Sequence, residues 1–176
     1  DNILSVTMGN DINPNNDINI RNLKMVVEEE VNYLKIGLFD KKYLLEHQII
    51  LKKINFKKTR PICVMFADQG FDLNNIEKLI DIGYQGIMID TCYKNSKSIV
   101  DLLSQKEIKD FLKRVKSRGM VCGLSGSLKL EHISMLRELK PDFLGFRGQL
   151  CDSLKARHKF NANLAKKVSK KIKLGS

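Results

Sequence analysis

The sequence has no tryptophan, only 3 prolines and only 3 histidines among its 176 residues. No apolar run approaches the roughly 20 residues that a membrane-spanning helix needs, and the first residues do not have the pattern of a secretory signal. The 4 cysteines lie far apart and form no CxxC pair, which argues against both a disulfide framework and a zinc site. We therefore expect a cytoplasmic protein with reduced thiols and no membrane partner.

Several chemical signatures are also missing. No GxGxxG run follows a strand, so a dinucleotide-binding fold is disfavoured. No spacing supports a Ser/His/Asp or Cys/His nucleophile, and no set of side chains has the spacing of metal ligands. We expect chemistry that uses no metal and no organic cofactor.

Positive charge is in excess, with 31 Lys and Arg against 20 Asp and Glu and a formal net charge of +11. Such an excess favours anionic partners, either phosphorylated metabolites or nucleic acid. Much of it lies in Lys166–Lys173, which is typical of the solvated face of a terminal helix. The chain also lacks the aromatic platform on which single-stranded nucleic acid stacks. A small phosphorylated substrate is therefore favoured over nucleic acid.

Apolar runs alternate six times with segments of helical periodicity, and together they predict one domain over residues 1–176. The strands are expected to begin near residues 3, 33, 63, 86, 121 and 143, and the helices to cover 20–32, 41–51, 73–82, 130–139 and 155–172, with another ending at Arg118. Ser104 and Glu107 form a capping box before that helix. Continuous apolar strands indicate a parallel sheet with helices outside, either a doubly wound sheet or a barrel.

The positions of the polar residues favour the barrel. They fall late in a strand or just after it, on the face where barrel enzymes place their chemistry: Lys35, Asp68, Asp90, Lys94, Ser127 and Arg147. We therefore predict an α/β fold of the (β/α)8 TIM-type barrel class, with six recognisable βα units.

Lys35 is the most unusual candidate because it interrupts the apolar strand YLKIG. A desolvated lysine loses pKa and becomes a usable amine nucleophile or base, although an edge-strand lysine that blocks aggregation is the alternative. Asp90 ends the strand GIMID, and Lys94 follows four residues later in a loop, so the two could form an acid/base pair. Their ordinary roles are turn capping for Asp90 and solvation for Lys94. Asp68 ends its strand and could likewise serve either in a site or in the turn that follows. The turn role is slightly favoured.

Two small-residue turns follow the last two strands. The first contains Gly126 and Ser127, and the second contains Arg147 and Gly148. Unblocked backbone N–H groups and a fixed guanidinium suit a phosphate, although ordinary strand-to-helix turns look the same. Lysines, carboxylates and a phosphate corner on one face fit Schiff-base chemistry on the carbonyl of a phosphorylated sugar.

The segments around these residues resemble those of a known family. Four segments, with Leu4–Gly9 (LSVTMG) as a looser fifth, resemble the (5-formylfuran-3-yl)methyl phosphate synthase family: Tyr33–Leu38 (YLKIGL), Met88–Lys94 (MIDTCYK), Leu124–His132 (LSGSLKLEH) and Gly145–Cys151 (GFRGQLC). The resemblance implies a lyase of methanofuran biosynthesis that joins two glyceraldehyde 3-phosphate molecules through a lysine Schiff base, with loss of phosphate and water. It implies catalytic roles for Lys35, Asp90 and Lys94, and we would place substrate phosphate at the two turns.

The chain departs from the family in two places. Family members begin with two further βα units, the second carrying a lysine that is the leading Schiff-base candidate. That segment could belong to another part of the protein, a homo-oligomer could close the gap, or the chain could be an inactive fragment. After Cys151 the family is glycine-rich with an arginine, for which Arg157 could substitute here. Another Schiff-base phosphosugar aldolase and a non-catalytic protein that binds phosphorylated ligands or nucleic acid remain alternatives.

Overall fold

The computed structural model describes residues 3–93, 97–152 and 159–173. Its strands form one parallel sheet in which each strand pairs with the next along the chain. This sequential order is the result of consecutive strand–helix units that all turn in the same direction. The strands are β1 (Ser5–Thr7), β2 (Tyr33–Leu38), β3 (Arg60–Phe66), β4 (Gly86–Asp90), β5 (Val121–Leu124) and β6 (Phe143–Leu144).

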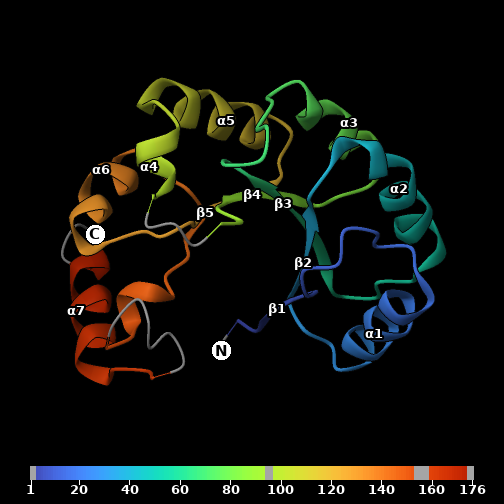
Figure 1. The fold of residues 1–176 in the computed structure, drawn as a ribbon, viewed down its shortest axis with the longest axis horizontal. Coiled ribbons are helices and arrows are strands. Elements are labelled where there is room, and N and C mark those ends of the chain that lie inside the picture. Colours follow the sequence, from blue (N-terminus) through green and yellow to red (C-terminus); the bar gives the residue numbers. More distant parts are fainter. Residues whose placement is uncertain (1–2, 94–96, 153–158, 174–176) are drawn as a thin grey trace.

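The helices lie outside the sheet, along an arc that runs from α1 past α5 to α7 (Figure 1). They are α1 (Asp17–Glu28), α2 (Leu44–Lys53), α3 (Asn75–Asp81), α4 (Ile99–Leu102), α5 (Gln105–Ser117), α6 (Ile133–Glu138) and α7 (Ala162–Lys173). Three single-turn 3₁₀ segments accompany them: η1 (Lys41–Tyr43), η2 (Leu130–His132) and η3 (Gly148–Leu150). The predicted parallel sheet with helices outside is thus observed.

Capping side chains determine where α5 and α1 begin. The capping box predicted before α5 is present, because the Glu107 N–H donates to Ser104 Oγ at 3.2 Å and the Glu107 carboxylate accepts from the Ser104 N–H at 2.7 Å. α1 begins three residues before the predicted start, since the Asn16 side chain accepts from the backbone N–H of Asn19 at 2.8 Å. α3 begins later than predicted, at Asn75.

The predicted (β/α)8 TIM-type barrel class is wrong for this chain. The sheet has six strands and is open, because β1 pairs only with β2 and β6 pairs only with β5. It is nevertheless strongly curled: the ring of Tyr33 on β2 lies 6.4 Å, centroid to centroid, from the ring of Phe143 on β6. The arc of elements stays open between α1 and α7 (Figure 1). Closure requires the number of strands and their stagger to match, and six strands of this curvature leave the two edges apart.

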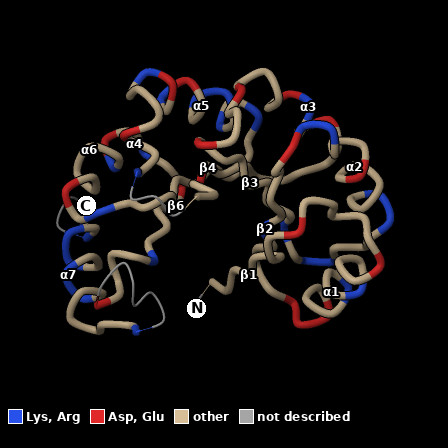
Figure 2. Tube along the Cα trace, viewed as in Figure 1, with Lys and Arg blue, Asp and Glu red and all other residues tan. Residues whose placement is uncertain are grey.

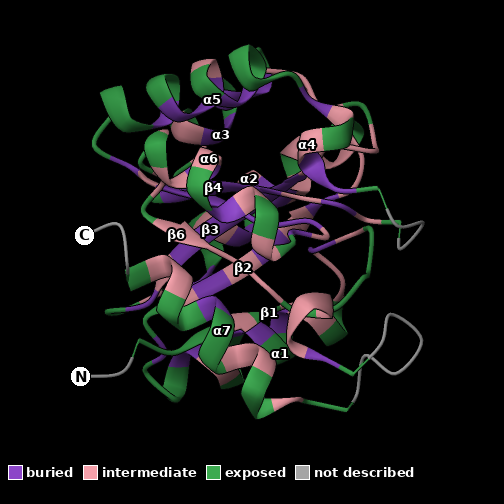
Figure 3. Ribbon diagram, turned by 90° about the vertical axis from the view of Figure 1, so that its left-hand side faces the viewer, coloured by how far each residue is buried: buried purple, intermediate pink, exposed green. Residues whose placement is uncertain are grey.

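The two faces of the sheet are buried to different extents. The convex face packs on the helices in a large core that includes Leu34, Ile87 and the fully buried Phe111 of α5. The concave face holds a small apolar cluster of Ile62, Val64 and Met88. Figure 3 shows burial concentrated on the strands and the inward sides of the helices, with exposed residues outside. The concave face is therefore apolar but partly open.

Candidate active site at the carboxyl ends of the strands

Lys35 and Asp90 lie on the concave face of the sheet. Residues paired in register between adjacent parallel strands point to the same side. Lys35 pairs with Ile62, and Asp90 pairs with Phe66. Ile62 belongs to the concave cluster and Phe66 packs against it. The register thus puts an amine on β2 and a carboxylate on β4 on the same apolar face of the sheet, with β3 between them.

Burial controls the electrostatics of Lys35. Its pKa is lowered from the usual value of 10.5, first because burial disfavours the ammonium, and the nearby Asp90 carboxylate offsets part of this effect. Within the part of the chain that the structure describes, no hydrogen bond or ion pair joins the two side chains. Charged residues otherwise lie mainly along the outer helices (Figure 2). Lys35 is thus a lysine in an apolar setting, as the strand pattern predicted.

The aromatic rings of Phe39 and Phe66 lie over Gly37, two residues after Lys35 on β2. They stack with centroids 4.7 Å apart, and they fill the space over Gly37, where an added Cβ would lie 2.7 Å from the Phe39 ring. A side chain at this position would push the rings out of place. Gly37 therefore lets the two rings pack closely over this part of β2.

The segment after Asp90 is fixed by two carboxylates. The Asp90 side chain accepts from the backbone N–H of Thr91 at 2.6 Å. Asp68, at the end of β3, accepts from the N–H of Cys92 at 2.8 Å and from the N–H of Tyr93 at 2.7 Å. The sequence favoured a local turn role for Asp68. Its carboxylate instead binds backbone N–H groups more than 20 residues ahead. The positioning contact of Asp68 is the feature that sequence reasoning missed.

Two predicted positions fall outside the described residues. Lys94, the second predicted catalytic lysine, follows Tyr93 in the stretch 94–96. Arg157, the substitute for the family arginine, belongs to the stretch 153–158. The site described here therefore rests on Lys35, Asp90 and the two turns.

The first predicted phosphate turn is a tight, partly buried loop. Gly126 has φ +98° and Ser127 has φ +52°, so both residues adopt left-handed conformations. The Ser127 hydroxyl oxygen is buried and has no hydrogen-bond partner. Within the described residues, the backbone N–H groups of Gly126 and Ser127 also meet no protein acceptor. A buried hydroxyl and free N–H groups in one turn are the donors that an oxyanion requires.

The second turn lies against the first. The backbone N–H of Gly145 donates to the carbonyl oxygen of Leu124 at 2.8 Å, and an added Cβ at Gly145 would lie 2.8 Å from the Cβ of Ser125. Arg147 is exposed, at the start of η3, and Gly148 follows it. The structure thus brings the starts of the two turns together at the ends of β5 and β6, and Arg147 follows within the second turn.

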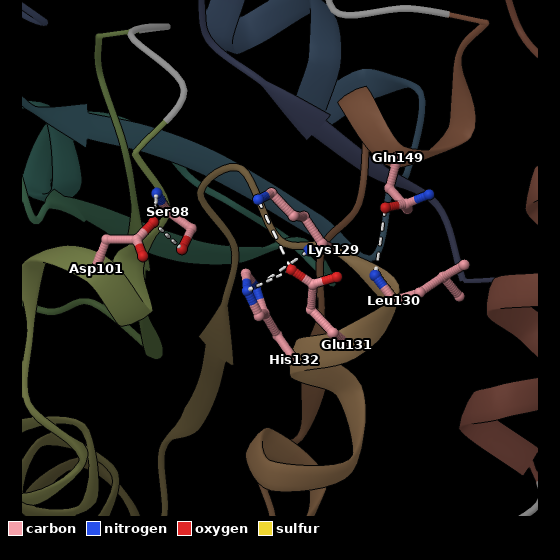
Figure 4. Close-up of polar contacts among 7 residues, drawn as sticks. All are labelled: Ser98, Asp101, Lys129, Leu130, Glu131, His132 and Gln149. Atoms are coloured by element: carbon pink, nitrogen blue, oxygen red, sulfur yellow. Dashed lines mark hydrogen bonds and ion pairs between the residues drawn. The ribbon is translucent and has the colours of Figure 1, made fainter.

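Figure 4 shows the polar residues that follow the first turn. The Gln149 side chain of η3 accepts from the N–H of Leu130 at 3.3 Å, which ties η3 to η2. His132 is half-buried, and its Nδ1 accepts from the backbone N–H of Lys129 at 3.2 Å. Burial lowers the His132 pKa, with Glu131 opposing. These contacts fix the segment that follows the first turn.

Other kinds of site are not seen in the described ranges. No group of three or more His, Cys, Asp or Glu side chains there could hold a metal ion. None of the described helices combines the length and the apolar character that crossing a membrane would require.

Comparisons with known proteins agree with the resemblance seen in the motifs. The (5-formylfuran-3-yl)methyl phosphate synthase of Methanosarcina mazei is 31% identical over 131 residues, which cover 68% of this chain and 56% of the relative. The Methanocaldococcus jannaschii enzyme of the same name is 26% identical over 153 residues, covering 81% and 64%. The chain thus spans less than two thirds of the length of these relatives.

Among solved structures, a chain of the Amycolatopsis orientalis BexX/CysO complex superposes with a TM-score of 0.61 over 96% of this chain and 66% of that one. At 10% identity this likeness concerns the fold alone. A family model described as 4-HFC-P synthase matches residues 1–169. The chain therefore belongs to the 4-HFC-P synthase family.

Proposed function

We propose that this chain carries the strand-end site of a (5-formylfuran-3-yl)methyl phosphate synthase of methanofuran biosynthesis. The proposed reaction is a lyase-type condensation of two glyceraldehyde 3-phosphate molecules, with loss of phosphate and water. Family membership and the names of the relatives support this assignment. Because the chain covers only part of those relatives, the complete activity is itself part of the proposal.

The observation that carries the proposal is the lowered pKa of Lys35 on an apolar concave face. Only an unprotonated amine attacks an aldehyde carbon, and burial increases its population at neutral pH. Attack by Nζ gives a neutral carbinolamine, whose hydroxyl takes up a proton from solvent and leaves as water, which gives a protonated imine. The imine withdraws electrons from the neighbouring carbon, so a base can remove a proton there.

Asp90 is the proton carrier that we assign to this step. Its carboxylate is within electrostatic range of Lys35, and its bond to the N–H of Thr91 fixes its orientation. The carboxylate also stabilises the protonated imine by its negative charge. Lys94 is proposed to share this proton transfer, as the family motif implies.

The two turns are proposed to bind the substrate phosphate. The free N–H groups of Gly126 and Ser127 and the buried Ser127 hydroxyl support this assignment. Arg147 would add a bidentate charged contact, and Gly148 would let the ligand approach the backbone. Phosphate held in this way would orient the aldehyde toward Lys35.

Borohydride trapping with glyceraldehyde 3-phosphate, followed by peptide mapping, tests the proposal. We expect an adduct on the peptide that contains Lys35, and its loss in Lys35→Arg, because a guanidinium forms no imine. Lys109→Arg on the exposed face of α5 is the matched control and should leave trapping unchanged. Trapping spread evenly over surface lysines, or no adduct at all, would contradict the Schiff-base assignment and favour a binding role without chemistry.

A further inference from the structure

A basic groove runs between α6 and α7 on the outer helical layer. It is open to solvent and has a volume of about 880 Å³. Its lining includes Leu130, Ser134 and one acidic residue, Glu138. The remaining lining residues are cations from both helices: Arg137, Lys140, Lys167, Lys170 and Lys171. Figure 2 shows Lys and Arg along α7, beside α6.

The cations of the groove are not neutralised by the protein. In the ranges that the structure describes, none of the five takes part in an ion pair. Arg137 and Lys171 are partly buried, whereas Lys140, Lys167 and Lys170 are exposed. Like charges held together in this way repel one another, and a bound anion would remove the repulsion.

The helix geometry arranges these charges in a line. Lys167, Lys170 and Lys171 are separated by three and four residues, so they share one face of α7, and the first and last lie about 6 Å apart along the axis. Arg137 in the last turn of α6 and Lys140 in the loop after it line the same groove. A single phosphate could neutralise only part of such a row, whereas a chain of linked phosphates could contact both helices.

We propose that the groove binds a small molecule that carries a chain of phosphates, such as inorganic triphosphate or a nucleoside triphosphate. The volume falls within the range of about 300–1,000 Å³ that small-molecule sites occupy. Ser134 supplies a hydroxyl donor, and Leu130 with the lysine stems supplies apolar surface for an organic part. This site is distinct from the two strand-end turns, and it does not depend on the proposed reaction.

Titration calorimetry on the whole chain at physiological ionic strength tests the inference, with inorganic triphosphate as the probe. The double variant Lys167→Gln/Lys171→Gln removes two groove charges from α7. Lys109→Gln/Lys113→Gln removes two exposed charges with the same four-residue spacing from α5. We expect one saturable site in the unmodified chain, a loss of affinity of about tenfold in the α7 variant, and little change in the α5 variant. Tighter binding of ATP than of inorganic triphosphate would identify the nucleoside as part of the ligand.

Four results would overturn the inference. Equal weakening in the two double variants, or no saturable binding, would mean that only the overall net charge attracts the anion. Loss of triphosphate binding in Arg147→Gln would move the ligand to the strand-end turns. Binding of a single-stranded RNA that triphosphate does not displace would show a nucleic-acid surface instead. Circular dichroism of each variant checks that the fold is retained.

Discussion

Replacement of Gly126 by alanine should damage the phosphate turn through two separate physical effects. The first is backbone strain, because an L-residue at φ +98° leaves its favoured conformations. The second is a clash: a Cβ would lie 2.6 Å from Cγ2 of Ile99 and 2.8 Å from the backbone nitrogen of Thr91. The nitrogen cannot rotate away as a side chain can, so the turn or the segment after Asp90 must move.

Gly119 provides a control that isolates the clash. It has φ +67° at the end of α5, and nothing lies within 4 Å of an added Cβ. Strain alone should cost Gly119→Ala about 1–2 kcal/mol of unfolding free energy. Gly126→Ala adds overpacking of about 1–3 kcal/mol, so we expect a total loss of about 2–5 kcal/mol for this variant.

Urea unfolding followed by circular dichroism measures both losses. Thermal unfolding should show the same order, at about 2–4 °C of melting temperature per kcal/mol for a chain of this size. Phosphate affinity, measured by calorimetry, should fall in Gly126→Ala and not in Gly119→Ala. Equal destabilisation of the two variants with unchanged phosphate affinity would refute the close packing inferred around the turn.

Three further predictions follow from single contacts. Asp90→Asn removes the charge that raises the Lys35 pKa, so imine trapping should begin at lower pH than in the unmodified chain; an unchanged pH profile would count against the coupling. Burial lowers the His47 pKa to about 4, below its unfolded value of 6.5, so the unfolding free energy should fall by up to about 3 kcal/mol as the pH drops from 6.5 to 4. His47→Gln should flatten this dependence in urea titrations, and an identical slope would refute it. Asp68→Asn turns one acceptor oxygen into a donor, so hydrogen exchange at the two amides that it binds should speed up, whereas unchanged protection would show that they have other partners.

The strands and their faces could be predicted because local patterns determine them. Continuous apolar runs marked the parallel strands, and Ser104 with Glu107 marked the start of α5. Lys35 stood out because a single charged residue in an apolar strand has few explanations. α4 was missed since its four residues are too short for helical periodicity, although Ser98 and Asp101 form a capping box there.

The features that the sequence did not predict depend on contacts between distant segments of the chain. The barrel was inferred from polar residues at the strand ends, but closure depends on the number and stagger of strands, which six units do not satisfy. Asp68 reaches the N–H groups of Cys92 and Tyr93 across 24 and 25 residues, and no local pattern encodes such a pair. The side-by-side position of the two turns likewise appears only once β5 and β6 are paired.

The central claim is that the amine of Lys35 and the phosphate turns serve the same ligand. The most direct test compares borohydride trapping with glyceraldehyde 3-phosphate and with unphosphorylated glyceraldehyde, with the adduct on Lys35 quantified by peptide mapping. We expect a strong preference for the phosphorylated aldehyde, and loss of that preference in Ser127→Ala and Arg147→Gln while some trapping remains. Equal trapping of both aldehydes, or a preference that survives both substitutions, would contradict it.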